Sequence, residues 1–318
     1  MRPFKNIDEQ INILIDRGLL IEDYNKAKRY LIHNNYYNVV NMYSKLFQEK
    51  ENLYIKGTTF EEIKALHIFD TEIKNLLMKY IIIAEKHFKS IFAYHFAKKY
   101  HNKPFAYLDT SNYSNSNPLA LTQTLSYISK KVNEQIRSKK ENSVKHHFAN
   151  HKDVPIWVIV NDLTLGNIIR LYKFIDNKTR NEIAKELSDI LDTNIHQKIN
   201  LEPNYLDKIL DNVLNVRNCV AHNNKLLKYK CNNNIKFIPA LYGSLQIDSK
   251  SSRQTPFHVF IALKCFLPTE DYALLHNSIL KRTINMSKKL NDNSMNLVLE
   301  SYGFPLSWHK KVSKIPQK

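Results

Sequence analysis

The feature that most constrains the fold is a stretch of about 40 residues, from Thr59 onward, in which apolar residues recur at helical spacing. Thr59 and Glu62 have the spacing of a capping box, which satisfies backbone N–H groups at the start of a helix. Apolar side chains then repeat every three or four residues as far as Phe92. The chain has only 5 glycines and 10 prolines among 318 residues, a composition that suits helices. The sequence therefore predicts an all-α protein organised by a long central helix.

The residues before this helix predict a small helical cap. Asn6 and Glu9 have the spacing of a second capping box, and another short helix is expected after Asp23. The cluster Asn34-Asn35-Tyr36-Tyr37 fits a helix junction, where the tyrosines either pack in the interior or stack on nucleic-acid bases. We assign residues 1–55 to this N-terminal helical cap.

The rest of the chain predicts further helices, in a domain that we place at residues 56–310. An apolar helix is expected to start at Pro155, with Trp157 in the core, and to break at Gly166-Asn167. The segment 229–242 reads either as a long loop or as a small hairpin, and residues 311–318 as a mobile basic tail. Other expected elements are a polar loop at 101–118, a basic amphipathic helix at 119–137, and helices at 179–187, 257–266 and 272–290.

The charge of the chain favours a polyanionic partner. Lys and Arg number 47 against 30 Asp and Glu, which gives a formal net charge of +17. A solvated surface rich in lysine and asparagine is the alternative explanation. A basic patch, which we call the tip patch, is the first candidate for RNA backbone contacts and comprises Arg137, Lys139, Lys140 and Lys145. His147 and His151 have a spacing that can bind zinc, but no cysteine or carboxylate pair completes a site, so we expect no metal and no cofactor.

Cysteine usage and hydropathy indicate a cytoplasmic protein. The three cysteines, Cys219, Cys231 and Cys265, are scattered and do not form a disulfide framework, which fits a reducing compartment. The N-terminus is polar, so we expect no signal peptide. No uncharged apolar run approaches the ~18 residues of a membrane span, so we expect no membrane association.

The segment that carries chemistry is Arg217-Asn218-Cys219-Val220-Ala221-His222. It lies near the end of an expected amphipathic helix whose predicted N-cap is Asn204. Asn218 and His222 are four residues apart and share a face, whereas Arg217 lies roughly 100° around the helix from Asn218. RNA carries its own nucleophile, the 2′-hydroxyl, so an arginine that holds phosphate and a histidine that moves protons suffice to cut it. Asn218 would orient the imidazole or donate to phosphate. The alternative is a structural role, with the histidine capping the last carbonyls and Cys219 packing in the interior.

This segment resembles the R-N-x-x-x-H motif of HEPN-domain ribonucleases. Much of the chain is similar to the abortive-infection branch of that superfamily, the AbiD- and AbiF-like proteins. The resemblance extends over about residues 2–308. The similar segments are Arg2-Pro3-Phe4, Ile7-Asp8-Glu9-Gln10, Arg17-Gly18-Leu19, Asn35-Tyr36-Tyr37, Pro155-Ile156-Trp157-Val158, Leu163-Thr164-Leu165-Gly166, and Gly303-Phe304-Pro305 with Trp308.

The resemblance implies a HEPN-like helical bundle that acts as a homodimer, with the two motif helices meeting at the interface. It also implies metal-independent RNA cleavage by a toxin or antiphage effector. The catalytic residues carried over are Arg217, Asn218 and His222. Glu85 corresponds to an acidic residue of the family, but the arginine expected four positions later is Lys89 here. Lys225 likewise stands where the family often has an arginine, so both accessory positions replace a bidentate donor by a point charge.

We therefore expect a metal-independent endoribonuclease, with RNA as its substrate and a homodimer interface that includes residues 213–226. Arg217 and His222 point roughly 140° apart on one ideal helix, which favours a site shared between two chains. A toxin needs restraint, so we also expect a cognate antitoxin, either a protein or a small RNA. The alternative is a non-catalytic protein of the same fold that binds RNA or a protein partner. A DNA-binding regulator is a third interpretation, which no helix-turn-helix signature favours.

Overall fold

The computed structural model describes residues 4–114, 116–245 and 247–316, and over these residues the protein is predominantly helical. The all-α fold predicted from the sequence is therefore confirmed, with one small antiparallel hairpin as an addition. Arg2 and Pro3, which belong to the N-terminal resemblance, lie outside the described residues. Within the described ranges, no helix combines the length and the apolar character needed to cross a membrane. The helices are α1 (Ile7–Asp16), α2 (Tyr24–Asn34), α3 (Phe60–Tyr100), α4 (Pro118–Ile136), α5 (Ser143–His151), α6 (Ile156–Ile159), α7 (Leu165–Phe174), α8 (Asn177–Ile195), α9 (Pro203–Ala221), α10 (Pro239–Tyr242), α11 (Pro256–Ala262), α12 (Thr269–Ser287), α13 (Asp292–Tyr302) and α14 (Trp308–Lys311).

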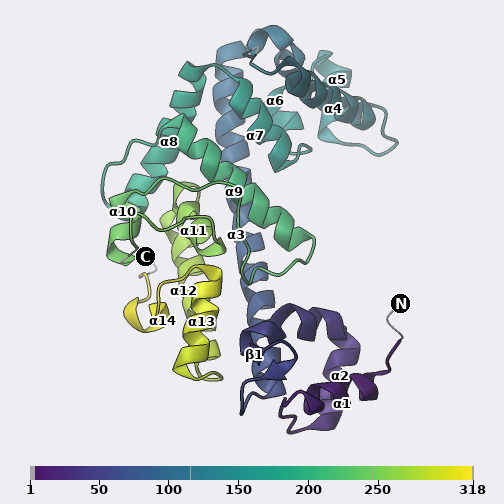
Figure 1. Ribbon diagram of the computed structural model, residues 1–318. Coiled ribbons are helices and arrows are strands. Elements are labelled where there is room, and N and C mark those ends of the chain that lie inside the picture. Colours follow the sequence, from purple (N-terminus) through teal and green to yellow (C-terminus); the bar gives the residue numbers. More distant parts are fainter. Residues whose placement is uncertain (1–3, 115, 246, 317–318) are drawn as a thin grey trace.

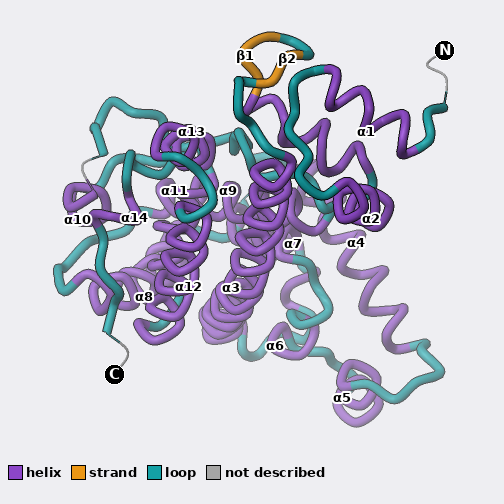
Figure 2. The backbone as a smooth tube through the Cα atoms, turned by 90° about the horizontal axis from the view of Figure 1, so that it is seen from below, coloured by secondary structure: helices purple, strands orange, loops and turns teal. Residues whose placement is uncertain are grey.

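The long helix α3 is the spine of the molecule (Figures 1 and 2). It begins where the sequence predicts: the Thr59 side chain accepts the Glu62 backbone N–H, and the Glu62 carboxylate accepts the backbone N–H of Thr59 at 2.8 Å. It then continues for 41 residues. Helices α12, α9, α8, α7 and α6 all pack against it. Because α3 extends through the whole assembly, it links parts of the chain that are distant in sequence.

The N-terminal segment consists of α1, α2 and the hairpin of β1 (Gln48–Lys50) and β2 (Leu53–Tyr54). The capping box of Asn6 and Glu9 and the N-cap of Asp23 are both present, as the sequence predicts. Asn35, with φ of 63°, ends α2 and makes the junction at the tyrosine pair. The hairpin was not predicted, because strands of three and two residues leave no periodic pattern.

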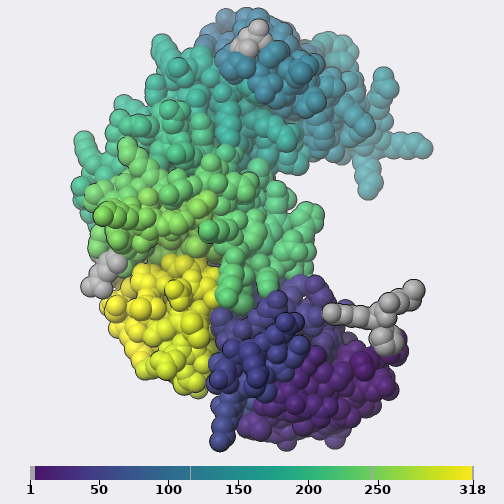
Figure 3. All heavy atoms as spheres, viewed as in Figure 1, coloured from purple at the N-terminus to yellow at the C-terminus, as the bar shows by residue number. Residues whose placement is uncertain are grey.

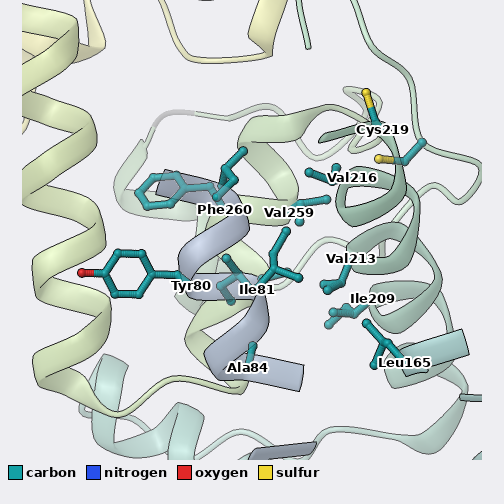
Figure 4. Close-up of a cluster of buried hydrophobic side chains, with 14 of the residues drawn as sticks. Tyr80, Ile81, Ala84, Leu165, Ile209, Val213, Val216, Cys219, Val259 and Phe260 are labelled. Carbon is teal, nitrogen blue, oxygen red and sulfur yellow. The ribbon is translucent and has the colours of Figure 1, made fainter. Parts of the chain in front are cut away.

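The core lies where α9 packs against α3, α7 and α11 (Figure 4). Side chains of α3 face side chains of α9 across this core, and α7 and α11 close it. Every labelled residue is buried: Tyr80, Ile81 and Ala84 of α3, Leu165 of α7, Ile209, Val213, Val216 and Cys219 of α9, and Val259 and Phe260 of α11. This packing fixes α9, the helix that carries the motif, against the spine.

The segment after Pro155 differs from the prediction in two respects. The apolar helix α6 has only four residues, and Trp157 does not lie in the core but is 55% exposed. The break lies before Thr164, and Gly166 and Asn167 are inside α7. Asn167 occupies the position that Glu or Gln takes in a capping box: its side chain accepts the backbone N–H of Thr164 at 3.1 Å, while Thr164 accepts the backbone N–H of Asn167. A residue pair that usually breaks a helix therefore helps to start one.

The region of α5 and the C-terminal part of the chain also differ from the prediction. Helices α5 and α13 were not predicted, and the segment 229–238 is a loop that leads into α10. The tail is not mobile as far as Ile315, because Asn277 of α12 donates to the Ile315 carbonyl at 2.8 Å and accepts its N–H at 2.9 Å. Residues 317–318 of the expected tail lie outside the described residues.

Candidate functional site

The motif helix α9 begins two residues earlier than predicted. Glu202 is the N-cap and Pro203 takes the first helical position, where its missing N–H leaves no bond unmade. Asn204, the predicted cap, is already inside the helix. The helix runs toward the concave side of the molecule, between the arm formed by α4 and α5 and the N-terminal segment (Figures 1 and 3).

The motif end of α9 is a complete Schellman motif. His222 is the C-cap, and Asn223 follows in the left-handed region with φ of 53°. The Asn224 N–H donates to the Cys219 carbonyl at 3.0 Å, and the Asn223 N–H donates to the Val220 carbonyl at 2.9 Å. Asparagine tolerates this conformation better than most residues. The position of His222 is thus fixed by backbone geometry on both sides.

A buried carboxylate, Asp70 of α3, organises the loop that follows. Asp70 is 0% exposed and accepts hydrogen bonds from the hydroxyls of Tyr43 (2.6 Å) and Tyr302 (2.5 Å) and from the backbone N–H of Leu226 (3.1 Å). Lys74, one turn along α3, has its ammonium group 3.4 Å from the Asp70 carboxylate. The N-terminal segment, the spine, the motif loop and α13 therefore converge on one carboxylate, which we call the Asp70 network.

Lys74 connects this network to the motif. Its ammonium group also donates to the side-chain oxygen of Asn223 at 2.9 Å. Burial raises the pKa of Tyr43 and of Tyr302, and the negative charge of Asp70 raises both pKa values further, so both hydroxyls stay protonated as donors. The residue next to His222 is thus tied to the spine through a buried ion pair.

The loop after the motif runs back along α9 and is bonded to it. The Asn212 side chain donates to the Asn233 carbonyl at 2.7 Å and accepts the Asn233 N–H at 3.0 Å. Asn215 accepts the N–H of Asn232 at 2.9 Å, and the Tyr229 hydroxyl donates to the Asn215 carbonyl at 3.1 Å. The asparagines on this face of α9 therefore hold the returning loop, residues 223–238, which we call the strap.

The three motif side chains differ in exposure. Asn218 and His222 are exposed, whereas Arg217 is partly buried and its Nε atom is buried without a hydrogen-bond partner. Among the described residues no carboxylate pairs with Arg217, in contrast to Arg180, which binds both oxygens of Asp207. Arg217 thus keeps donors that the protein itself does not satisfy.

Cys219, inside the motif, packs in the interior. It is 5% exposed, and burial raises the pKa of its thiol to about 11. The structure therefore agrees with the packing interpretation of this residue.

The accessory residues Glu85, Lys89 and Lys225 make their side-chain contacts with residues other than Arg217 and His222. Glu85 pairs with Lys89 at 2.7 Å, and Lys89 also donates to the Leu163 carbonyl at 2.6 Å. Lys225 donates to the Met42 carbonyl of the N-terminal segment at 3.0 Å. Burial, together with the nearby charges of other lysines, holds the pKa of Lys225 below its ordinary value. All three residues thus make structural contacts in this state of the chain.

The tip patch lies at the junction of α4 and α5, on a different arm from the motif (Figure 1). Arg137 is the C-cap of α4, and Lys139 and Lys140 are exposed in the connecting turn. Lys145 pairs with Glu141 at 2.6 Å, which reduces its positive charge toward a partner. Among the residues that the structure describes, Arg137, Lys139 and Lys140 of this patch therefore make no ion pair.

The sequence analysis missed Asp70, Lys74, Tyr43 and Tyr302. The first two carry a readable signal, because an acidic residue followed by a lysine four positions later interrupts an apolar helix, as at Glu85 and Lys89. The two tyrosines carry none, because they meet Asp70 across 27 and 232 residues of sequence.

A comparison with known protein families finds a match over more than half of the chain. The model of a family described as Abi-like protein matches residues 29–228, a range that contains α3, the motif helix and the first residues of the strap. No curated protein and no solved structure matches the chain. Because the matched range covers more than half of the 318 residues, the chain belongs to the family of Abi-like proteins.

Proposed function

We propose that this protein is a metal-independent endoribonuclease that serves abortive-infection defence as an antiphage effector or toxin. Membership of the Abi-like family indicates abortive-infection defence, and the chemistry is inferred from the motif. The observation that carries the proposal is Arg217, a partly buried arginine that has no carboxylate partner among the described residues and lies five residues from an exposed histidine on a fixed helix end. An unpaired guanidinium of this kind is well suited to an incoming phosphate.

The reaction would use the nucleophile of the substrate. His222 takes the proton of the 2′-hydroxyl, or gives one to the departing 5′-oxygen, as the 2′-oxygen attacks the phosphorus and the P–O5′ bond breaks; water exchanges the other proton. Arg217 holds the phosphate and offsets the charge that develops on its oxygens. Asn218, one turn before His222 on the same face, orients the imidazole or donates to a phosphate oxygen. The products are a 2′,3′-cyclic phosphate and a free 5′-hydroxyl.

The electrostatics of the helix end supports a role for additional cations. The C-terminal end of a helix carries partial negative charge, which disfavours a phosphate there. Lys225 and Lys228 follow His222 in the adjoining loop, and Lys228 is exposed. Together with Arg217, these charges offset the helix dipole and favour an RNA backbone at this surface.

The proposed site is shared between two chains. The 140° divergence of Arg217 and His222 on one ideal helix favours a two-fold arrangement of two motif helices, with an interface that includes residues 213–226. Exposed residues at this end supply the surface, namely Asn218, Ala221, His222 and Asn224. Mixing inactive Arg217→Ala with inactive His222→Ala chains should restore part of the cleavage, and light scattering should give about twice the mass of one chain.

The decisive experiment compares RNA cleavage by Arg217→Ala and His222→Ala with matched controls, in EDTA. His196, the exposed C-cap of α8, is the control for His222, and exposed Arg170 of α7 is the control for Arg217. We expect both motif variants to lose cleavage and growth arrest and both controls to keep them. End mapping should find cyclic phosphates; 5′-phosphate products or loss of activity in EDTA would refute the mechanism.

The non-catalytic alternative has its own signature. If the wild-type chain binds RNA but leaves it intact in the presence and absence of metal, the motif is a binding surface. A cognate antitoxin, protein or small RNA, would then compete for the same exposed helix end.

A further inference from the structure

A basic groove with aromatic walls lies along the second half of α3, where α6 packs beside it. The groove has a volume of about 570 Å³, within the range of sites that bind small organic ligands. Its walls include Tyr94 of α3 and Trp157 of α6, and Lys86, Lys98 and His101 lie along it. We call it the α3–α6 groove.

Trp157 is presented to solvent by a rigid support. The other three residues of α6, Ile156, Val158 and Ile159, are 3%, 8% and 0% exposed, so the short helix is anchored in the core by every side chain except the tryptophan. The Pro155 carbonyl accepts the N–H groups of Val158 and Ile159, which fixes the start of the helix. A large aromatic ring that is 55% exposed on a fixed element is typical of a binding surface.

The charges around the groove are of one sign. Lys86, Lys98 and His101 are exposed, and neither lysine has an ion-pair partner among the residues that the structure describes. Lys89, at the floor, is already paired with Glu85. In the described part of the chain no carboxylate lines the groove. An anionic ligand therefore meets free cations along the groove and no like charge.

We propose that the α3–α6 groove binds single-stranded RNA, with bases stacked on Trp157 and Tyr94 and phosphates held by Lys86 and Lys98. Aromatic platforms beside free cations are the combination by which proteins hold unpaired strands. Exposed Ser90 and Asn161 supply polar groups that can reach base edges. Both the stacking and the charge are required, which distinguishes this ligand from an apolar peptide.

The groove is separate from the motif. Lys74, which contacts the residue next to His222, and Tyr94 are 20 residues apart on one continuous helix, or about 30 Å at 1.5 Å per residue. The groove therefore binds a different part of an RNA from the part at Arg217 and His222, and its occupation does not depend on cleavage.

The two tryptophans allow a direct test. Trp157 is exposed, whereas Trp308 is 1% exposed, so quenching by a ligand in the groove reports on Trp157 alone. The probe is a 2′-O-methyl oligouridine of about eight nucleotides, a length in the usual range of single-strand sites. It has no free 2′-hydroxyl, so the proposed cleavage reaction cannot consume it. We expect the oligonucleotide to quench the fluorescence and to protect Trp157 from acrylamide, and an abasic strand of equal length to do neither.

Variants separate stacking from charge. Trp157→Leu should lower the affinity about tenfold, the loss expected for one stacked base, while Leu274→Ala, at an exposed apolar residue of α12, should leave it unchanged. Replacing Lys86 and Lys98 by Ala should reduce the slope of log affinity against log salt by about 1.4, since each phosphate contact on a single strand contributes about 0.7. The matched control replaces exposed Lys288 and Lys289 at the end of α12.

Three results would overturn the proposal. In the first, the oligonucleotide binds without changing the fluorescence of Trp157. In the second, the Trp157→Leu variant binds with wild-type affinity. In the third, uridine monophosphate quenches the fluorescence as strongly as the oligonucleotide at equal concentration. The first two place the RNA elsewhere and leave the groove to a protein partner, and the third makes it a nucleotide site. None of them bears on cleavage at Arg217 and His222, which is measured separately.

Discussion

Substitution of Asp70 by asparagine tests whether the Asp70 network holds the motif loop in place. Asparagine has nearly the same shape, and its oxygen can still accept from Tyr302 and Leu226, which share Oδ1. Its amide group would face Tyr43 and Lys74, which now meet Oδ2. Lys74, whose side chain is 7% exposed, would then keep a buried charge without a counter-ion. Loss of one partner of a buried pair typically costs about 3–5 kcal/mol of unfolding free energy, and we expect a value in this range.

The assay is urea unfolding followed by circular dichroism at one fixed protein concentration, because the stability of the proposed dimer would depend on concentration. Glu85→Gln is the matched control, since Glu85 also pairs with a lysine four residues later on α3. Lys89 there retains the Leu163 carbonyl as a partner, so we expect a loss of only about 1–2 kcal/mol. RNA cleavage by Asp70→Asn should also fall, because the carboxylate no longer positions the Lys74 ammonium group, which donates to Asn223 beside His222.

A double-mutant cycle decides whether the buried charge is the cause. Changing Lys74 to methionine in the Asp70→Asn background removes the orphaned ammonium group, so the double variant should recover about 1.5–3 kcal/mol relative to Asp70→Asn alone. If Asp70→Asn lies within about 1 kcal/mol of the wild type, or if the double variant is no more stable than the single one, the network does not stabilise the loop in the way described.

Three further predictions concern stability and binding. Gly303→Ala should lower the free energy of unfolding by about 3 kcal/mol, because φ is +84° and the new methyl group would overlap Thr255. Gly57→Ala, where φ is +89° but the space is open, should lower it by only about 1–2 kcal/mol. Equal losses in urea unfolding would exclude the overlap. Burial lowers the pKa of His258 to about 4 from 6.5, so its contribution to stability is complete above pH 6.5 and is lost as the pH falls toward 4. That loss amounts to about 3 kcal/mol, and a His258→Gln variant with the same acid dependence as the wild type would contradict it. Replacing the tip patch by alanines should weaken RNA binding and flatten its salt dependence with little change in stability, and an unaltered salt slope in a filter-binding titration would place the RNA elsewhere.

The sequence predicts best what is encoded locally. The capping boxes at Asn6 and Thr59 and the course of α3 follow from residues within one or two turns of each other, and the structure confirms them. Trp157 was misplaced because a helix of four residues is too short for periodicity to show which side faces the core. Asn167 was read as a breaker because its capping role depends on Thr164 being correctly placed.

For the candidate site, too, the sequence shows the local features but not the long-range contacts. The chemical identities of Arg217, Asn218 and His222, and their place near the end of a helix, are visible in the sequence. The contacts that fix this end are not visible, because Asp70 meets Leu226 across 156 residues and Tyr302 across 232. Such contacts arise from the packing of helices that are remote in the chain, and no local pattern specifies them.

The convergence on Asp70 has a consequence for how the protein matures during translation. A growing chain presents Tyr43 and the spine first and the motif next, and Tyr302 emerges only about 80 residues after His222. Until then the carboxylate lacks one of its hydroxyl donors, and the loop beside His222 lacks its final anchor. A nascent chain that has not yet reached Tyr302 is therefore the form in which this end of α9 is least ordered, so the fully anchored motif arises only after Tyr302 has been synthesised.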